Sequence, residues 1–394
     1  MTAGPTPEAP HARVPPWRDI GVLRVVAQLV ALALVLLAGA WLMSNLVDNM
    51  RQTRLTFGFG FLNSTAGFDI GESLFAYSAT DTYLRAFLVG LANTLMVSLV
   101  GIVLATILGL ITGIARLSRN WLVNKMAAGY VELMRNTPLL VQLVLIYAVL
   151  IQLPSVANSI SLPGSIFLNQ RGLSFPRPVP EQGFTPWLLI VLVAVALAVA
   201  AHVLAGRREE AGRDPGHLRL AGLAVVVAAA IGGALAVGGP IGFDLPQQQR
   251  FNFVGGLTIS PELTALLVGL VVYTAAFIGE VVRGGIQAVR RGQLEAAASI
   301  GLTDMQTLRM IVLPQALRII VPPLTSQYLN LAKNSSLAIA VGFADLFSVS
   351  RTMANQTGNP ISVILLVMAT YLLISLVTSL LMNIYNRRVQ VLER

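Results

Sequence analysis

The sequence predicts an all-α integral membrane protein with about eight transmembrane helices. Only 11% of its 394 residues are charged and 55% are hydrophobic, whereas about a quarter of the residues in soluble domains are charged. The mean hydropathy is +0.73. Eight apolar stretches reach the roughly 20 residues that a spanning helix needs: residues 22–43, 86–115, 128–152, 187–206, 218–239, 263–287, 317–341 and 361–384.

The composition excludes several kinds of site. The chain has no cysteine, so it holds no disulfide, thiolate metal site or cysteine nucleophile. Its three histidines form no cluster, and we expect no metal site. In a soluble protein the excess of 27 Lys and Arg over 18 Asp and Glu would suggest nucleic acid. In a membrane protein, basic residues instead hold cytoplasmic loops in place, so we expect a lipid bilayer and no nucleic acid.

The basic residues also predict the orientation of the spans. Eighteen of them lie in one set of alternating segments, and only seven lie in the other set. Loops rich in Lys and Arg stay in the cytoplasm, so both termini are predicted to be cytoplasmic. The first set consists of the N-terminus, the loops near 116–127, 207–219 and 283–318, and the C-terminus.

The spans differ in polarity, which predicts how the chain is organised. The stretches 187–206 and 218–239 contain almost nothing polar beyond their ends, so they can only pack together or face lipid. Loops rich in Pro, Gly and Gln flank them. We therefore interpret residues 153–262 as an accessory insertion into a smaller core. The regions are a disordered cytoplasmic lead (1–21), a first accessory helix with an outer segment (22–85), an N-terminal core region (86–152), an accessory insertion with two helices and outer loops (153–262) and a C-terminal core region (263–394).

The second stretch carries small residues at four-residue spacing. Gly101, Ala105, Gly109 and Gly113 form one smooth stripe on a helix, which lets another backbone approach closely. We predict helix packing for this stripe and no chemistry.

A polar, helix-prone segment, EAAASIGLTDMQTLRMIVLP (295–314), interrupts the apolar pattern. We predict a short helix from Glu295 to Ile300 that ends at Gly301, because glycine tolerates the left-handed conformation at a helix terminus. Thr303 and Asp304 can cap a second helix through Leu313, after which Pro314 marks the return to the membrane. The pattern alone fits an ordinary amphipathic connector equally well.

This segment resembles the coupling loop of ABC importer permeases. The pattern EAA-x3-G-x9-I-x-LP is matched at every fixed position: Glu295, Ala296, Ala297, Gly301, Ile311, Leu313 and Pro314. Other segments resemble the polar amino-acid (His/Glu/Gln/Arg) family of these permeases, and most closely its general L-amino-acid branch. They are 132–143, 273–293 and 313–324 for the family, and 167–178, 251–262, 326–338, 355–360 and 382–394 for the branch.

The resemblance implies a type I importer permease bundle with a five-helix core and three accessory helices. It places the bundle in a bacterial inner membrane, where it would take up L-amino acids of polar or broad specificity. It also implies a second permease in a heterodimer, two ATPase subunits and a periplasmic amino-acid-binding protein. The sequence has no G-x-x-x-x-G-K-[ST] phosphate loop, so we expect no enzyme activity and no cofactor bound directly. ATP and Mg would bind the partner ATPase, which would dock on the coupling loop within 290–316.

Several polar side chains inside the spans are candidates for the substrate pathway. A lysine about 15 residues into a span costs several kcal/mol to bury unless it is paired or hydrated, so Lys333, with Asn334 and Ser335, is the first candidate. It would contact a substrate carboxylate, although a structural ion pair explains it equally well. Asn93 and Thr94 can line the same route, but such residues more often bond neighbouring helices.

Two further pairs of charges have helical spacing. Glu132 with Arg135, and Glu280 with Arg283, are three residues apart near cytoplasmic ends. Ion pairs at the helix interface are the first interpretation, and a gate is the second. The main alternative function is an ion-gradient-driven secondary amino-acid transporter, which would not explain the coupling-loop pattern.

Overall fold

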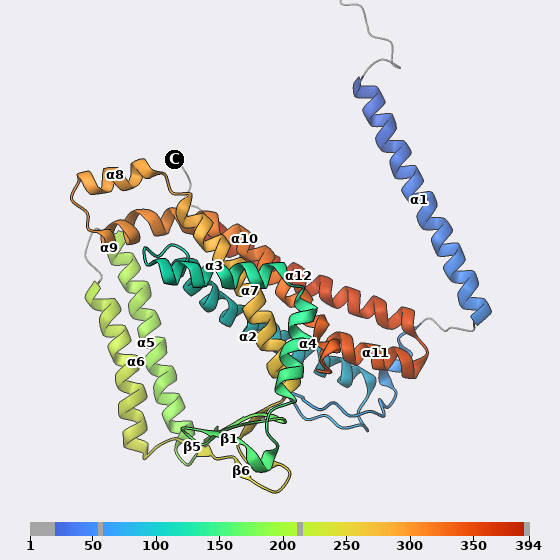
Figure 1. The fold of residues 1–394 in the computed structure, drawn as a ribbon, viewed down its shortest axis with the longest axis horizontal. Coiled ribbons are helices and arrows are strands. Elements are labelled where there is room, and N and C mark those ends of the chain that lie inside the picture. The colour runs from blue at the N-terminus through green and yellow to red at the C-terminus, as the bar shows by residue number, and fades with distance from the viewer. Residues whose placement is uncertain (1–19, 54–57, 211–215, 390–394) are drawn as a thin grey trace, which may run out of the picture.

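The computed structural model describes residues 20–53, 58–210 and 216–389, and almost all of the predicted lead (1–21) lies outside them. Within these ranges, seven helices are long and apolar enough to cross a membrane, or eight if one bent pair is a single span. The prediction of a helical membrane bundle is confirmed (Figure 1). The long helices are α1 (Ile20–Thr53), α2 (Tyr83–Ala115), α5 (Phe184–Glu210), α6 (Gly216–Val237), α7 (Pro261–Gln287), α10 (Leu313–Asn334) and α12 (Pro360–Val389).

Shorter elements connect these helices. They are η1 (Gly60–Asn63), α3 (Trp121–Asn136), α4 (Leu139–Leu150), η2 (Val156–Asn158), α8 (Arg291–Ser299), α9 (Asp304–Thr307), the π-helical turn η3 (Leu308–Val312), η4 (Ser335–Ala340) and α11 (Leu346–Thr357). α1 stands apart from the bundle in Figure 1. No residue of its most apolar window is buried, so lipid is the natural partner of its side chains.

The predicted span over 128–152 is bent in the middle and consists of two helices, α3 and α4. α3 and α4 meet at an angle of 106°. Thr137 is extended, with φ −109° and ψ 132°, because the ring of Pro138 disfavours the helical conformation in the residue before it. The amide Nε2 of Gln142 donates to the carbonyl oxygens of Met134 at 3.0 Å and of Thr137 at 3.1 Å. The break is therefore capped by a side chain from α4.

The predicted packing of the glycine stripe on α2 is confirmed. A Cβ atom placed on Gly109 would lie 2.5 Å from Ile278 Cγ2, and one on Gly113 would lie 2.7 Å from Val282 Cβ. Both partners belong to α7, so the missing side chains let the two helices approach closely. Gly101 faces Leu331 of α10 in the same way.

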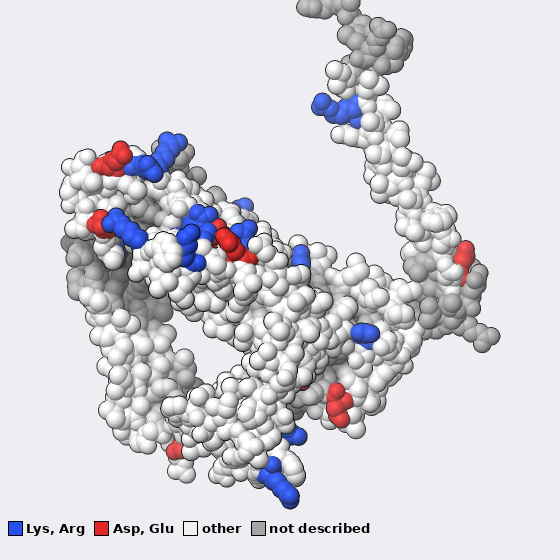
Figure 2. Space-filling view, viewed as in Figure 1, with Lys and Arg blue, Asp and Glu red and all other residues white. Residues whose placement is uncertain are grey.

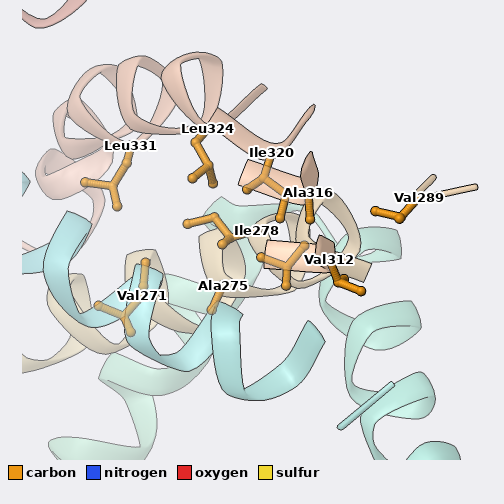
Figure 3. Close-up of a cluster of buried hydrophobic side chains, with 11 residues drawn as sticks. Val271, Ala275, Ile278, Val289, Val312, Ala316, Ile320, Leu324 and Leu331 are labelled. Carbon is orange, nitrogen blue, oxygen red and sulfur yellow. The ribbon is translucent and has the colours of Figure 1, made fainter. Parts of the chain in front are cut away.

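The core continues between α7 and α10. Figure 3 shows Ile278 of α7 facing Ile320 and Leu324 of α10, with Val271 and Ala275 on the same helix. These side chains are buried and belong to one apolar cluster. α7 is thus packed between α2 and α10, which makes it the central helix of the bundle.

The insertion 153–262 contains short strands that the sequence prediction did not include. β1–β2–β3–β8 form one antiparallel sheet, β4 pairs with β5, and β6 pairs with β7. Ile259 of β8 pairs with Leu173 of β3, directly before α7 begins. The strands are β1 (Ile160–Leu162), β2 (Ile166–Asn169), β3 (Gly172–Phe175), β4 (Arg177–Pro180), β5 (Ile241–Asp244), β6 (Gln247–Gln248), β7 (Phe253–Val254) and β8 (Leu257–Ile259).

The two helices of the insertion, α5 and α6, lie side by side, away from the central helices (Figure 1). The indole Nε1 of Trp187 donates to the carbonyl oxygen of Ala230 at 2.9 Å and fastens the pair. The strands lie at the end of the bundle opposite to α8. α7 joins these two ends, and its 27 residues span about 40 Å at 1.5 Å per residue.

Candidate functional site

The segment that resembles the coupling loop contains a short helix that ends at a glycine. α8 runs from Arg291 to Ser299 and is followed by Gly301, whose φ is +80°. The N–H of Gly301 donates to the carbonyl of Ala298 at 3.0 Å, and that of Leu302 to Ala297 at 3.1 Å. A Cβ atom on Gly301 would meet nothing within 4 Å. Glycine is therefore favoured here by its backbone conformation and not by crowding.

The second predicted helix of this segment begins as expected but does not end at Pro314. Thr303 and Gln306 form a capping box at the start of α9. The helix then passes through the π turn 308–312 into α10, so one helical rod runs from Asp304 to Ala340. Pro314 has no N–H with which to bond the carbonyl of Met310, and the wider turn directly before it accommodates that loss.

The segment 295–314 exposes small and apolar side chains at its surface. Glu295, Ala296, Gly301, Leu313 and Pro314 are exposed, Ile311 is half-buried and Ala297 is buried. Large apolar side chains are also exposed, with 75% of Ile300, 70% of Met305 and 62% of Met310 accessible. Sequence reasoning missed these three. Figure 2 shows charged side chains gathered mainly over α8, α9 and the nearby ends of α3 and α7. An apolar patch rimmed by charges is typical of a protein-binding surface.

The residues predicted for the substrate pathway are only partly brought together. Thr94, Ser335 and Asn93 are buried, Asn334 is half-buried and Lys333 is exposed. Thr94 and Ser335 both lie near the hydroxyl of Tyr371, whereas Lys333 lies on the outside of α10. The pathway remains a prediction.

Asn93 and Thr94 form hydrogen bonds that connect α2 to neighbouring segments. Asn93 Nδ2 donates to the carbonyl oxygens of Glu72 at 2.8 Å and Ala344 at 2.9 Å. Thr94 Oγ1 accepts from the N–H of Leu346 at 2.9 Å. These bonds fasten α2 to the chain on either side of it.

Replacing Asn93 with alanine leaves two carbonyl oxygens without their donor. Asn93 is 1% exposed, so we expect Asn93→Ala to destabilise the protein by about 1–3 kcal/mol. Thermal unfolding in detergent measures this loss. Asn355→Ala, at an exposed position, is the control and should unfold like the natural protein. Equal midpoints for both variants would contradict the role assigned to Asn93.

A second polar cluster joins the ends of α2, α3 and α7. The carboxylate of Glu280 lies 2.8 Å from Arg283 Nη2, 3.0 Å from Arg116 Nε and 4.0 Å from Arg135 Nη1. The Glu280–Arg283 pair therefore forms as predicted. Arg135 forms a cross-helix pair with Glu280, not a within-helix pair with Glu132, and it stacks over the ring of Phe277 at 5.3 Å. Glu132 is exposed and lines the adjoining cavity of about 330 Å³.

Most of the chain matches a known family of proteins. The family described as "Binding-protein-dependent transport system inner membrane component" matches residues 101–391. The chain belongs to this family. It is a multi-pass permease of the inner membrane, the membrane component of an ABC importer that works with ATPase and binding-protein partners. This membership rejects the alternative of an ion-gradient-driven transporter.

Named relatives match the permease over almost its whole length. It is 44% identical to the general L-amino acid transport system permease protein AapQ of Rhizobium johnstonii, covering 92% of each chain. It is 45% identical to the putative amino-acid ABC transporter permease protein YhdX of Escherichia coli, covering 93% of the permease and 94% of that protein. A crystal structure of an amino acid ABC transporter with histidines matches with a TM-score of 0.47 and 22% identity, covering 78% of the permease and 95% of that chain.

Proposed function

We propose that the permease takes up L-amino acids of polar or broad specificity, driven by ATP that a separate ATPase hydrolyses. The proposal that the substrates are amino acids is supported by the names of the relatives described above. A further relative from Rhodobacter capsulatus, 40% identical over 94% of each chain, is named as a glutamate/glutamine/aspartate/asparagine transport system permease protein. The permease itself contributes no ATPase motif, so ATP and Mg bind the partner.

The observation that carries this proposal is the surface formed by α8, Gly301 and the exposed apolar residues after it. Three alanines make α8 a slim helix that can enter a groove of the ATPase. Closure of two ATPase subunits would move this helix, and with it the rod that begins at Asp304. The helix bundle would switch between an inward-facing and an outward-facing state, and the contact with the ATPase would shift the balance between them.

The proposed complex has both termini of the permease and α8 in the cytoplasm, and the β strands outside. This orientation is supported by the excess of basic residues in the segments on the α8 side. A second, different permease completes the pathway, with two ATPase subunits and a periplasmic amino-acid-binding protein. Escherichia coli K12 has two separately named permeases that match this chain, YhdX over 93% of its length and YhdY over 24%. Two different permeases in one organism are consistent with a heterodimer.

Replacing Gly301 with valine tests the coupling. A β-branched residue at φ +80° is strained by about 1–2 kcal/mol, so α8 would end differently and leave its groove. We expect Gly301→Val to lose most of the co-purified ATPase and at least about tenfold of the ATP-dependent uptake. Gly301→Asn should retain both, since asparagine tolerates this conformation.

A matched control separates coupling from strain alone. Gly358 ends α11 with φ 63° and has nothing within 4 Å of a Cβ atom. It is therefore as open as Gly301 but lies away from α8. Gly358→Val should keep the ATPase in the purified complex. If Gly301→Val shows normal co-purification and normal uptake, the docking proposal is wrong. If uptake of labelled amino acids survives ATP depletion, the ATP-driven function is wrong.

A further inference from the structure

A cavity of about 480 Å³ lies at the end of the bundle that carries the β strands. Four separate segments of the chain line it. Glu72 comes from the segment between α1 and α2, and Arg171 from the turn between β2 and β3. Glu262 lies in the first turn of α7, and the loop 342–344 follows η4. The accessory insertion thus completes a cavity that the core alone would leave open on one side.

Hydrogen bonds hold the two carboxylates of this cavity in place. Glu72 Oε1 accepts the N–H of Ser260 at 3.0 Å, the side chain of Ser260 also bonds Glu72, and Glu262 Oε1 accepts the hydroxyl of Tyr147 at 3.0 Å. A carboxylate has about four acceptor positions, so each can also accept from a ligand. Neither carboxylate takes part in the ion pairs found among the described residues.

The two carboxylates also repel one another. Burial raises the pKa of Glu72, and the negative charge of Glu262 raises it further. A cation between them would relieve both the burial and the repulsion. An ammonium group suits this position, since it offers three donors to oxygens that have lost some of their water.

Arg171 adds the opposite charge at the rim. Its backbone N–H donates to Asn169 Oδ1 at 2.8 Å, which fixes the turn, and its side chain is exposed beside the cavity. A guanidinium binds a carboxylate through two parallel hydrogen bonds. The cavity therefore offers groups for an ammonium and for a carboxylate within a space of amino-acid size.

We propose that this cavity is an outer receiving site for a zwitterionic α-amino acid, with Glu72 and Glu262 holding the ammonium and Arg171 the carboxylate. The proposal rests on the proposed function for its cargo and for placing the β strands outside. The loop 342–344 follows η4, which begins at Ser335, and η4 follows the helix α10 that carries Lys333. The proposed receiving site is thus next along the chain to residues of the predicted substrate pathway.

Charge-removing variants that keep the hydrogen bonds test the site. Glu72→Gln and Glu262→Gln retain an amide oxygen for the Ser260 N–H and the Tyr147 hydroxyl, so only the charge is lost. In the full complex with its ATPase and binding protein, we expect the double variant to lower initial uptake of labelled L-glutamine about tenfold. ATPase co-purification should not change. Arg250→Gln, on the same insertion but outside the cavity, should transport normally.

A second experiment tests ligand binding in the cavity without changing Glu72, Glu262 or Arg171. The natural chain has no cysteine, so Thr258→Cys places a unique thiol on the cavity lining. L-glutamine should slow its modification by a maleimide, and should leave an Arg250→Cys thiol unaffected. Absence of protection at position 258, or equal protection by Ca²⁺ alone, would overturn the receiving site. If the natural complex shows no ATP-driven amino-acid uptake while protection persists, the proposed function fails and the binding site stands.

Discussion

Gly109→Ala is expected to destabilise the permease, whereas Gly129→Ala is expected to stabilise it slightly. The added methyl at position 109 would lie 2.5 Å from Ile278 Cγ2, 2.6 Å from its Cβ and 3.1 Å from the carbonyl oxygen of Ala275. A change of rotamer moves only the first of these atoms, so α2 and α7 would have to separate. Overpacking of this kind costs about 1–3 kcal/mol or more.

The control comes from a glycine in open space. A methyl at Gly129, inside α3, would meet nothing within 4 Å, and alanine favours the helix by about 0.5–1 kcal/mol. The same chemical change should therefore shift the unfolding temperature in opposite directions at the two positions. The amount of folded permease in the membrane is the second readout, and Gly109→Val should nearly abolish it. Parallel shifts at positions 109 and 129 would mean that the α2–α7 contact is looser than described.

Glu280→Gln is expected to have the next largest effect. Three arginines, on α2, α3 and α7, surround this one carboxylate, and the glutamine would leave their positive charges without compensation. Breaking a fully buried pair costs about 3–5 kcal/mol. The arginine side chains here are 19%, 45% and 30% exposed, so solvent screening lowers the expected loss to about 1–3 kcal/mol.

Thermal unfolding at two salt concentrations checks this value. The loss should be smaller at high salt, because added ions screen the exposed share of the repulsion. Asp244→Asn removes the exposed pair with Arg177, whose side chains are 33% and 54% exposed, and should change stability by less than about 1 kcal/mol. A gate role for Glu280 requires an altered ATPase rate in the assembled complex, whereas an interface role requires only the loss of stability. Equal shifts for Glu280→Gln and Asp244→Asn would refute the three-helix junction.

The sequence predicts best what depends on local chemistry. Apolar runs identify most of the spans, the stripe from Gly101 to Gly113 identifies a packing face, and Gly301 marks the end of α8. The break at Thr137–Pro138 was missed because one proline inside an apolar run gives too weak a signal against hydropathy. The sequence also predicts a helix end before Pro314. That end is absent, because a single π turn keeps the helix continuous through this proline.

Contacts between distant regions of the chain could not be predicted. Arg135 lies three residues from Glu132 in sequence, yet its partner is on α7, 145 positions further along the chain. From the sequence, Asn93 can line the pathway or bond neighbouring helices, and only the fold gives its partners, which are carbonyl oxygens in two loops. Glu72, Arg171 and Glu262 carry no shared spacing at all. Only the folded insertion brings them to one cavity.

The continuity of the helical rod from Asp304 to Ala340 has a mechanical consequence. Its 37 residues extend about 55 Å at 1.5 Å per residue. A rod of that length acts as a lever: a tilt of about 10° at one end displaces the other end by roughly 10 Å. Small rotations imposed beside α8 would therefore be enlarged at Ser335 and η4, without any change in the rod's own hydrogen bonds.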